Sequence, residues 1–175
     1  MTTPTGSSQE PLKSRLNHMN ALEELRRSFR PDRVTALFVG ESAPASGSFF
    51  YSGNSTLFRE MKKAFGNADS FLDDFKMKGF YLDDLSLTPI NKLSSRERNR
   101  HRREAIAGFT ERLFQYKPKA IVIVMRAIVP MIREAMDNAG ISYEPSCVCH
   151  PAFGNSRRFQ SEMMKVIPQL LHAER

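Results

Sequence analysis

The feature that most constrains the fold of this chain is a regular alternation of short strand-like segments with longer amphipathic ones. Val34–Val39, with one Thr, and Ala120–Met125 are apolar runs, and Lys78–Leu82 and Ser142–Cys149 are weaker strand candidates. Short apolar strands that alternate with helices are typical of a parallel sheet with both faces buried. We therefore predict an α/β fold around a central four-stranded parallel sheet. Pro145 predicts that the last strand lies at an edge of the sheet or starts late.

The stretches between these segments carry apolar residues at three- and four-residue steps, the period of a helix with one buried face. Asn54 or Ser55 can cap one such helix, and Ser94 and Glu97 have the spacing of a capping box. Pro168 is expected to kink or end the last helix. The predicted helices cover residues 12–29, 55–65, 94–114, 131–136 and 159–171.

The length and the termini limit the organisation of the chain. It has 175 residues, the size of one domain, and no internal repeat or linker divides it. We predict a flexible N-terminal tail over residues 1–11, which are rich in Thr, Pro, Ser and Gly, and a single domain over residues 12–175. No apolar run is long enough to cross a bilayer, and the N-terminus lacks the apolar region of a secretory signal. We expect a cytoplasmic monomer that does not enter a membrane.

Charge and cysteine content limit the function. The chain has 26 Lys and Arg against 19 Asp and Glu, a net charge of +7. This excess favours an anionic partner, either nucleic acid or a membrane surface. The two cysteines, Cys147 and Cys149, lie too close in sequence to favour a disulfide. With His150 beside them they still lack a second pair of zinc ligands, so we expect neither a metal nor another cofactor.

Polar residues follow each predicted strand. Because the carboxyl ends of parallel strands meet at one edge of a sheet, we expect these side chains to converge on a ligand site there. They are Glu41 and Ser42 after the first strand, Asp83 and Asp84 after the second, Arg126 after the third and His150 after the fourth.

Two loops near these strand ends carry further candidates. Residues 47–54 hold three aromatic side chains between small residues, and such side chains either fill the core or stack on a flat ligand. Arg157 and Arg158 lie a few residues beyond His150 and could hold phosphates. The basic run over residues 92–103 is typical of a solvated helix face.

Ser42, an aspartate near position 84, and His150 also occur in the chain order of an α/β-hydrolase triad. In the motif G-x-S-x-G, however, Pro44 takes the place of the last Gly, and no helix follows directly. A serine hydrolase that uses Ser42 and His150 is one alternative that the sequence leaves open.

Over residues 34–167 the chain resembles the uracil-DNA glycosylase superfamily. Gly40 to Pro44 is similar to Gly-Glu-Ala-Pro-Gly, the first motif of the iron–sulfur uracil glycosylases, and His150 to Ala152 is similar to the second motif, His-Pro-Ser. Phe80 to Asp84 resembles the strand of that family that ends in a uracil-recognising Asn, whose place Asp84 takes. The resemblance implies a three-layer α/β/α sandwich and hydrolysis of the N-glycosidic bond of a damaged or modified base that is flipped out of DNA.

The resemblance also assigns roles. His150 would donate to a base oxygen and stabilise the leaving base, and Glu41, or backbone carbonyls of its loop, would position the attacking water. Gly40, Ser42, Phe50 and Asp84 would bind the substrate, with Phe50 stacked on the base. Phe153, Arg157 and Arg158 would contact nucleic acid, which we expect to be DNA in preference to RNA.

Asp84 changes the expected base. Asn can accept from N3–H of uracil and donate to O4, whereas an ionised Asp can only accept. An acceptor that faces O4 would be unfavourable by about 1–3 kcal/mol. We therefore expect a base with an exocyclic amino group, or a protonated Asp84, and not ordinary uracil specificity. A member of the same fold that binds a nucleotide or nucleic acid without cleaving it is the other alternative.

Overall fold

The fold is known from a computed structural model that describes residues 10–172. At its centre lies a parallel sheet of four strands, in the order β2-β1-β3-β4. The strands are β1 (Ala36–Gly40), β2 (Phe80–Asp84), β3 (Ala120–Ile123) and β4 (Ser146–Cys147). This confirms the predicted α/β class and the four-stranded parallel sheet.

The central strand β1 is apolar because both of its faces are covered. Every residue of β1 and β2 is buried, and Ala36 at the start of β1 pairs with Phe80 on one side and Ala120 on the other. Strand β4 begins directly after Pro145 and lies at the edge of the sheet, as the missing N–H of that proline predicts.

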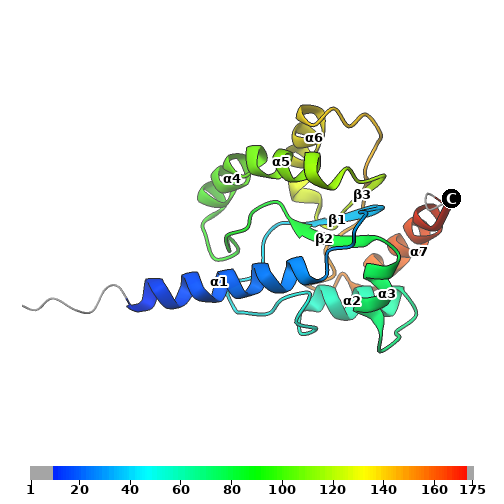
Figure 1. Cartoon of the computed structure of the whole chain (residues 1–175), viewed down its shortest axis with the longest axis horizontal. Helices are drawn as coiled ribbons and strands as arrows, with labels where there is room; N and C mark the ends of the chain where they lie inside the picture. The colour runs from blue at the N-terminus through cyan, green and yellow to red at the C-terminus, as the bar shows by residue number, and fades with distance from the viewer. Residues whose placement is uncertain (1–9, 173–175) are drawn as a thin grey trace, which may run out of the picture.

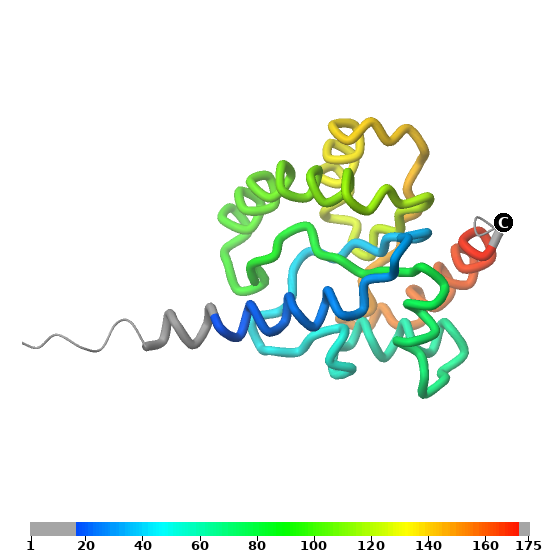
Figure 2. The backbone as a smooth tube through the Cα atoms, in the orientation of Figure 1, coloured from blue at the N-terminus to red at the C-terminus, as the bar shows by residue number. Residues whose placement is uncertain are grey.

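Helices form a layer on each side of the sheet (Figure 1). One layer holds α4 (Ser95–Glu104), α5 (Ile106–Tyr116) and α6 (Val129–Asn138), which follows the 3₁₀ turn η1 (Arg126–Ile128). The other holds α2 (Thr56–Ala64), α3 (Phe71–Met77) and α7 (Ser156–His172). In that second layer α2 and α7 lie side by side although they are distant in sequence, and Gln160 Nε2 donates to the carbonyl of Glu60 at 2.8 Å (Figure 2). The arrangement is that of a three-layer α/β/α sandwich.

Helix α1 (Glu10–Ser28) confirms the first predicted helix and packs beside the edge strand β2. The ring of Phe29 stacks on Tyr51, with centroids 5.2 Å apart, and the hydroxyl of Tyr51 donates to the carbonyl of Leu82 at 2.9 Å. The predicted flexible tail lies outside the described residues up to position 9, and its last two residues begin α1. None of the helices in the described part of the chain is both long and apolar enough to cross a bilayer.

The predicted helix caps are present. Ser55 Oγ accepts from the N–H of Phe58 at 3.0 Å, and Ser94 and Glu97 form the capping box that opens α4. The single helix predicted over residues 94–114 is wrong, because the chain forms two helices that meet at Ala105. None of the residues of α4 is buried, whereas α5 packs an apolar face on α6. Because the two helices pack differently, they do not continue as one.

Two further helices differ from expectation. Helix α3 was not predicted, since its seven residues are too few to show a clear period. Helix α7 continues through Pro168 to His172, so Pro168 does not end it. Val166 and Leu170, on either side of the proline, are both buried in the core, and this packing holds the last turn in place.

Candidate functional site

A cavity of about 350 Å³ lies at the carboxyl edge of the sheet and is lined by most of the predicted site residues. Those that line it are Gly40, Glu41, Ser42, Phe50, Asp84, His150 and Phe153. Arg157 and Arg158 do not line it. The cavity is within the range of small-molecule sites, and it has room for a flat ligand such as a nucleobase.

Gly40 and Asp84 form the floor of this site. They end β1 and β2 and are register partners in the sheet. A Cβ built on Gly40 would overlap with Oδ1 of Asp84, so only glycine leaves space for that carboxylate. The glycine therefore allows the second aspartate of β2 to reach the cavity.

His150 enters the cavity from the loop that follows β4. Its Nδ1 accepts from the backbone N–H of Ala152 at 3.2 Å, so the neutral ring carries its proton on Nε2. Burial lowers the pKa of His150 below its ordinary value, and the charge of Glu41 opposes this only in part. At neutral pH the side chain is therefore an uncharged hydrogen-bond donor.

The hydrogen bonds of Ser42 do not support the hydrolase alternative. Its Oγ accepts from the N–H of Ile90 at 3.3 Å. A triad needs a histidine whose Nε2 takes the proton of the serine hydroxyl, whereas the bond from Ala152 to Nδ1 of His150 favours the tautomer with a proton already on Nε2.

Glu41 is engaged by two arginines of α4. Arg98 Nε donates to Oε1 at 2.8 Å while its Nη2 contacts Oε2, and Arg102 Nε donates to Oε1 at 2.6 Å. The prediction of a solvated face for the basic run is therefore wrong for these two side chains. Their spacing of four residues on a capped helix was the signal that could have placed them on one inward face.

Asp84 is held by an arginine that the sequence analysis missed. Arg26 of α1 is buried, and its Nη2 donates to Oδ2 of Asp84 at 2.9 Å while its Nη1 contacts Asp83. Within the described residues, Oδ1 of Asp84 has no hydrogen-bond partner and remains for a ligand. Burial raises the pKa of Asp84 to about 6 against the opposing charge of Arg26.

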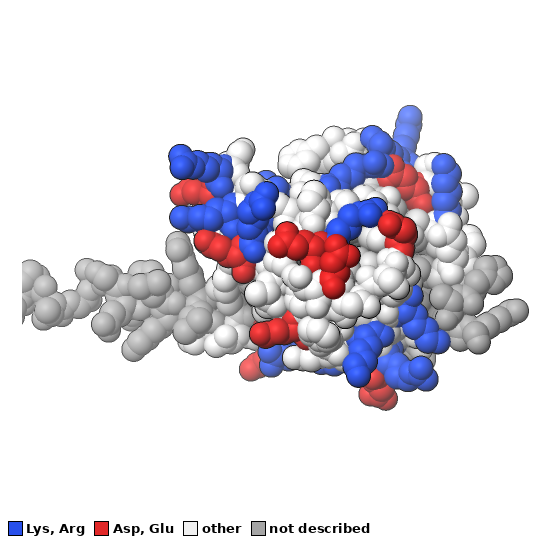
Figure 3. Space-filling model, turned by 90° about the horizontal axis from the view of Figure 1, so that it is seen from above, with Lys and Arg blue, Asp and Glu red and all other residues white. Residues whose placement is uncertain are grey.

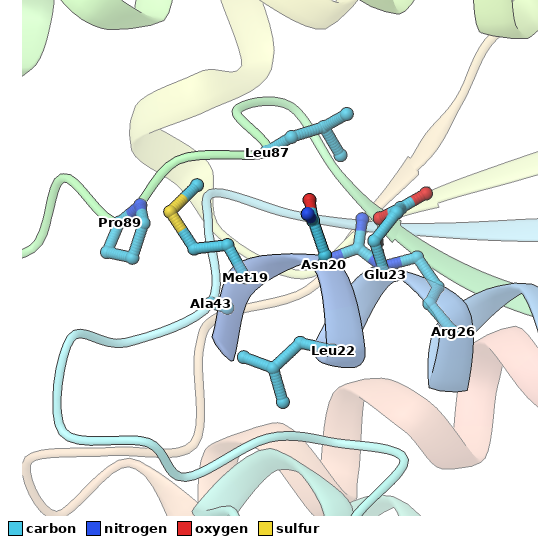
Figure 4. A pocket seen from close by; sticks show the side chains of 8 residues that line it. All are labelled: Met19, Asn20, Leu22, Glu23, Arg26, Ala43, Leu87 and Pro89. Atoms are coloured by element: carbon cyan, nitrogen blue, oxygen red, sulfur yellow. Dashed lines mark ion pairs between the residues drawn. The ribbon is translucent and has the colours of Figure 1, made fainter. Parts of the chain in front are cut away.

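Behind Arg26 lies a second, smaller cavity of about 160 Å³ between α1 and the loops that carry Ala43 and Leu87 (Figure 4). Arg26 Nε is buried there without a hydrogen-bond partner among the described residues. Oε2 of Glu23 lies 3.7 Å from this Nε, beyond hydrogen-bond distance. No local sequence signal marks Arg26 as a residue of the site, because it lies far from β2 in the chain.

Phe50 belongs both to the core and to the wall of the cavity. It is almost completely buried, and its ring packs edge-on against Tyr51 at 5.0 Å and Phe58 at 6.0 Å. Phe49 also lines the cavity and carries the guanidinium of Arg26 over its ring, 5.5 Å from the centroid. The expectation that loop aromatics fill the core is confirmed for these two rings, and stacking on a flat ligand stays a prediction.

Phe153 lies at the cavity wall and is fully exposed to solvent. Its backbone has φ of 58°, in the left-handed region, and Gly154 follows with φ of 82°. Arg157 and Arg158 follow a few residues later in the sequence, and both are exposed. Nε of Arg158 pairs with Oε1 of Glu162 at 2.9 Å. Among residues 10–172, no three His, Cys, Asp or Glu side chains are grouped as metal ligands would be.

The fold and the cavity define a parallel α/β protein with a cavity at the carboxyl edge of its sheet. A scan of the chain against models of protein families finds no match, and neither does a search of curated proteins. The resemblance to uracil-DNA glycosylases therefore rests on the motifs quoted above and stays a prediction.

Proposed function

We propose that this protein is a DNA glycosylase that hydrolyses the N-glycosidic bond of a damaged or modified base flipped out of DNA. One observation supports this above the others: Phe50, Asp84 and His150, from three distant parts of the chain, line one cavity. An aromatic ring, a hydrogen-bonding carboxylate and a neutral imidazole donor are the groups that would stack on, recognise and activate a nucleobase.

The proposed reaction separates charge between the sugar and the base. As the bond between C1′ and the base nitrogen breaks, its electron pair moves to the base and the sugar becomes positive. The Nε2–H of His150 would stabilise the negative charge on the leaving base through a hydrogen bond. Water then adds to C1′ and loses a proton, and the base anion takes up one proton, which gives an abasic site and the neutral free base.

Asp84 would determine which base is accepted. Arg26 holds Oδ2 of this carboxylate, so Oδ1 is the atom left to accept from the base. When it is ionised, that oxygen matches an N–H or an exocyclic amino group and opposes a carbonyl. The proposed substrate is therefore a base with an amino donor on the edge that enters the cavity.

Phe153 and the arginines that follow it would contact the duplex. An exposed apolar side chain beside a base-sized cavity can occupy the space that a flipped base leaves. Arg157 and Arg158 would bind phosphates on either side of that nucleotide. For Arg158 this requires sharing its guanidinium with Glu162.

The test is a panel of duplex oligonucleotides, each with one modified or deaminated base, assayed for alkali-labile abasic sites. The wild-type protein is expected to cleave at least one of them. His150→Ala should lower that rate by about 100-fold or more, because it removes the donor to the leaving base. His18→Ala, at an exposed histidine of α1 that does not line the cavity, is the matched control. An unchanged rate in His150→Ala, or no abasic product from any base, contradicts the proposal.

A second function is favoured by the contacts of Glu41. Both of its carboxylate oxygens bind arginines, which leaves it poorly placed to position a water. The chain would then bind a nucleotide or nucleic acid without cleaving it. Salt-dependent binding to the same oligonucleotides with no abasic product distinguishes this binder from the enzyme.

A further inference from the structure

Helix α4 carries two arginine stripes on opposite sides. At about 100° per residue, Arg98 and Arg102 share one side of the helix, and Arg96, Arg100 and Arg103 share the other. The first stripe points inward to Glu41 at the end of β1. Since Glu41 fixes that face, the second stripe is held toward solvent, on the side of α4 opposite to Arg98, which itself lines the cavity.

The outer stripe, which consists of Arg96, Arg100 and Arg103, is only weakly neutralised. All three residues are exposed, and the nearest carboxylate is that of Glu104, whose Oε1 lies 3.6 Å from Nε of Arg100. The other acid of the helix, Glu97, is used in the capping box with Ser94. Figure 3 shows Lys and Arg gathered at the end of the molecule where α4 lies.

The composition of α4 distinguishes between anionic partners. The helix has the sequence SRERNRHRRE, which contains no apolar residue. A helix that lies on a membrane surface needs an apolar face to enter the headgroup region, and α4 has none. Nucleic acid requires only cations at regular spacing, and the outer stripe spans a rise of about 10 Å, close to three nucleotide steps along one strand of duplex DNA.

We propose that the outer stripe of α4 binds the phosphates of the DNA strand whose base enters the cavity. This inference rests on the proposed function, because that function brings the strand to the cavity mouth. It assigns a structural role to Glu41, which orients α4 by binding its inner arginines. The partner is defined by its chemistry, a chain of phosphodiesters with unpaired or flipped bases.

The test compares two triple variants that each reduce the net charge by three. In one, Arg96, Arg100 and Arg103 become Ala, a change that favours helix and so leaves α4 able to form. In the control, Arg33, Lys78 and Lys119 become Ala. These residues are exposed and lie at the amino ends of β1, β2 and β3, at the opposite edge of the sheet from the cavity.

Binding of a fluorescein-labelled 15-mer, as single strand and as duplex, is measured by anisotropy over a range of salt concentrations. The α4 triple variant should bind at physiological salt roughly tenfold or more weakly than wild type, and its slope of log affinity against log salt should be shallower by about 2–3. The control should keep the wild-type slope.

Equal losses in the two triple variants, an unchanged slope in the α4 variant, or a wild-type chain that binds neither oligonucleotide would each overturn the inference. Circular dichroism of both variants checks that the fold is kept. The measurement needs no cleavage, so a chain that makes no abasic sites but loses affinity through α4 contradicts the enzymatic proposal and supports this surface.

Discussion

At the scale of single residues, the site depends on two adjacent aspartates with different surroundings. Successive residues of a strand point to opposite faces, so Asp83 meets Arg112 and Tyr116 of α5 whereas Asp84 reaches the cavity. Burial alone would raise the pKa of Asp83, but the guanidiniums of Arg26 and Arg112 outweigh it and lower that pKa. Asp83 is therefore an ionised side chain that pairs with residues of the fold, and Asp84 is the aspartate that remains available to a ligand in the cavity.

The sequence predicted the position of Asp84 but not its partner. A polar residue at the end of an apolar strand is a local signal, and the topology of a parallel sheet places it at the ligand edge. Arg26 lies on an amphipathic helix next to the exposed Arg27, and only the packing of α1 beside β2 identifies Arg26 as buried. An ion pair between residues that are far apart in the chain produces no periodic pattern in the sequence from which it could be predicted.

Replacement of Asp84 by Asn tests base recognition directly. The amide can both accept from N3–H and donate to O4, so Asp84→Asn should raise the cleavage of uracil relative to an amino-bearing base. Relief of an acceptor–acceptor contact predicts a change of about 10- to 100-fold in that ratio. The measurement is the yield of abasic sites from paired oligonucleotides that differ only in the target base.

The same residue predicts a pH dependence. Because burial raises the pKa of Asp84 to about 6, the side chain gains a proton, and so a donor, as the pH falls through that value. Uracil cleavage by the wild-type protein should therefore increase relative to the amino-bearing base below pH 6, whereas Asp84→Asn should show no such change. A ratio that is the same in both proteins at every pH removes Asp84 from base recognition.

At the scale of elements, features that depend on a few neighbouring residues could be predicted from the sequence, and features that depend on tertiary packing could not. The caps at Ser55 and Ser94 could be predicted because a cap involves a few neighbouring residues. The break at Ala105 could not, since it results from the attraction of α4 to Glu41 and of α5 to α6. At Pro168 the local sequence favours an end to the helix, but the helix continues because the residues on either side of the proline are buried in the core.

The short strand β4 depends on a contact from α7. Glu162 accepts from the N–H of Cys149 at 2.6 Å, just beyond β4, and also binds Arg126 at 2.6 Å and Arg158 at 2.9 Å. Burial raises the pKa of Glu162, but the backbone N–H and the two guanidiniums outweigh it and lower the pKa to about 2. The ionised carboxylate therefore joins the edge of the sheet to the helix that covers it.

Glu162→Gln should lower the free energy of unfolding by about 1–2 kcal/mol at pH 7, the contribution of hydrogen bonds to a charged group. A carboxyl with a lowered pKa stabilises the fold above its ordinary pKa of 4.5 and loses that effect as the pH falls toward 2. The gap between wild type and variant, measured by urea denaturation, should therefore narrow below pH 4.5. Glu111→Gln, at an exposed position of α5, is the control. If the difference in the free energy of unfolding between wild type and Glu162→Gln does not change with pH, the ionised carboxylate of Glu162 does not account for the stabilisation.

At the scale of the whole molecule, most of the aromatic core lies outside the candidate site, although Phe49 and Phe50 belong to both. Aromatic side chains fill the space between the sheet and the layer of α2 and α3, where Phe38, Phe75 and Phe80 have centroids 5.2–6.0 Å apart. The candidate site lies instead at the carboxyl edge, among loops and strand ends. The α/β class was predictable because a parallel sheet shows in the alternation of segments, whereas the shape of the cavity depends on how loops from distant segments meet.

This separation predicts opposite results for two phenylalanines. Phe75 is buried in the aromatic layer, so Phe75→Ala should lower the free energy of unfolding by about 3–5 kcal/mol. Phe153 is fully exposed, so Phe153→Ser should change that free energy by less than about 0.5 kcal/mol. Urea denaturation of both variants measures the two effects.

For cleavage of DNA, in contrast to stability, we expect the exposed Phe153 to matter. A side chain that fills the gap left by a flipped base matters in a duplex and not in a single strand, which has no stacked partner to displace. Phe153→Ser should therefore cleave duplex DNA more slowly than wild type does while it cleaves single strands at the same rate. If both substrates are affected equally, or neither is, Phe153 belongs only to the wall of the cavity, and the exposed ring with its left-handed backbone needs another explanation.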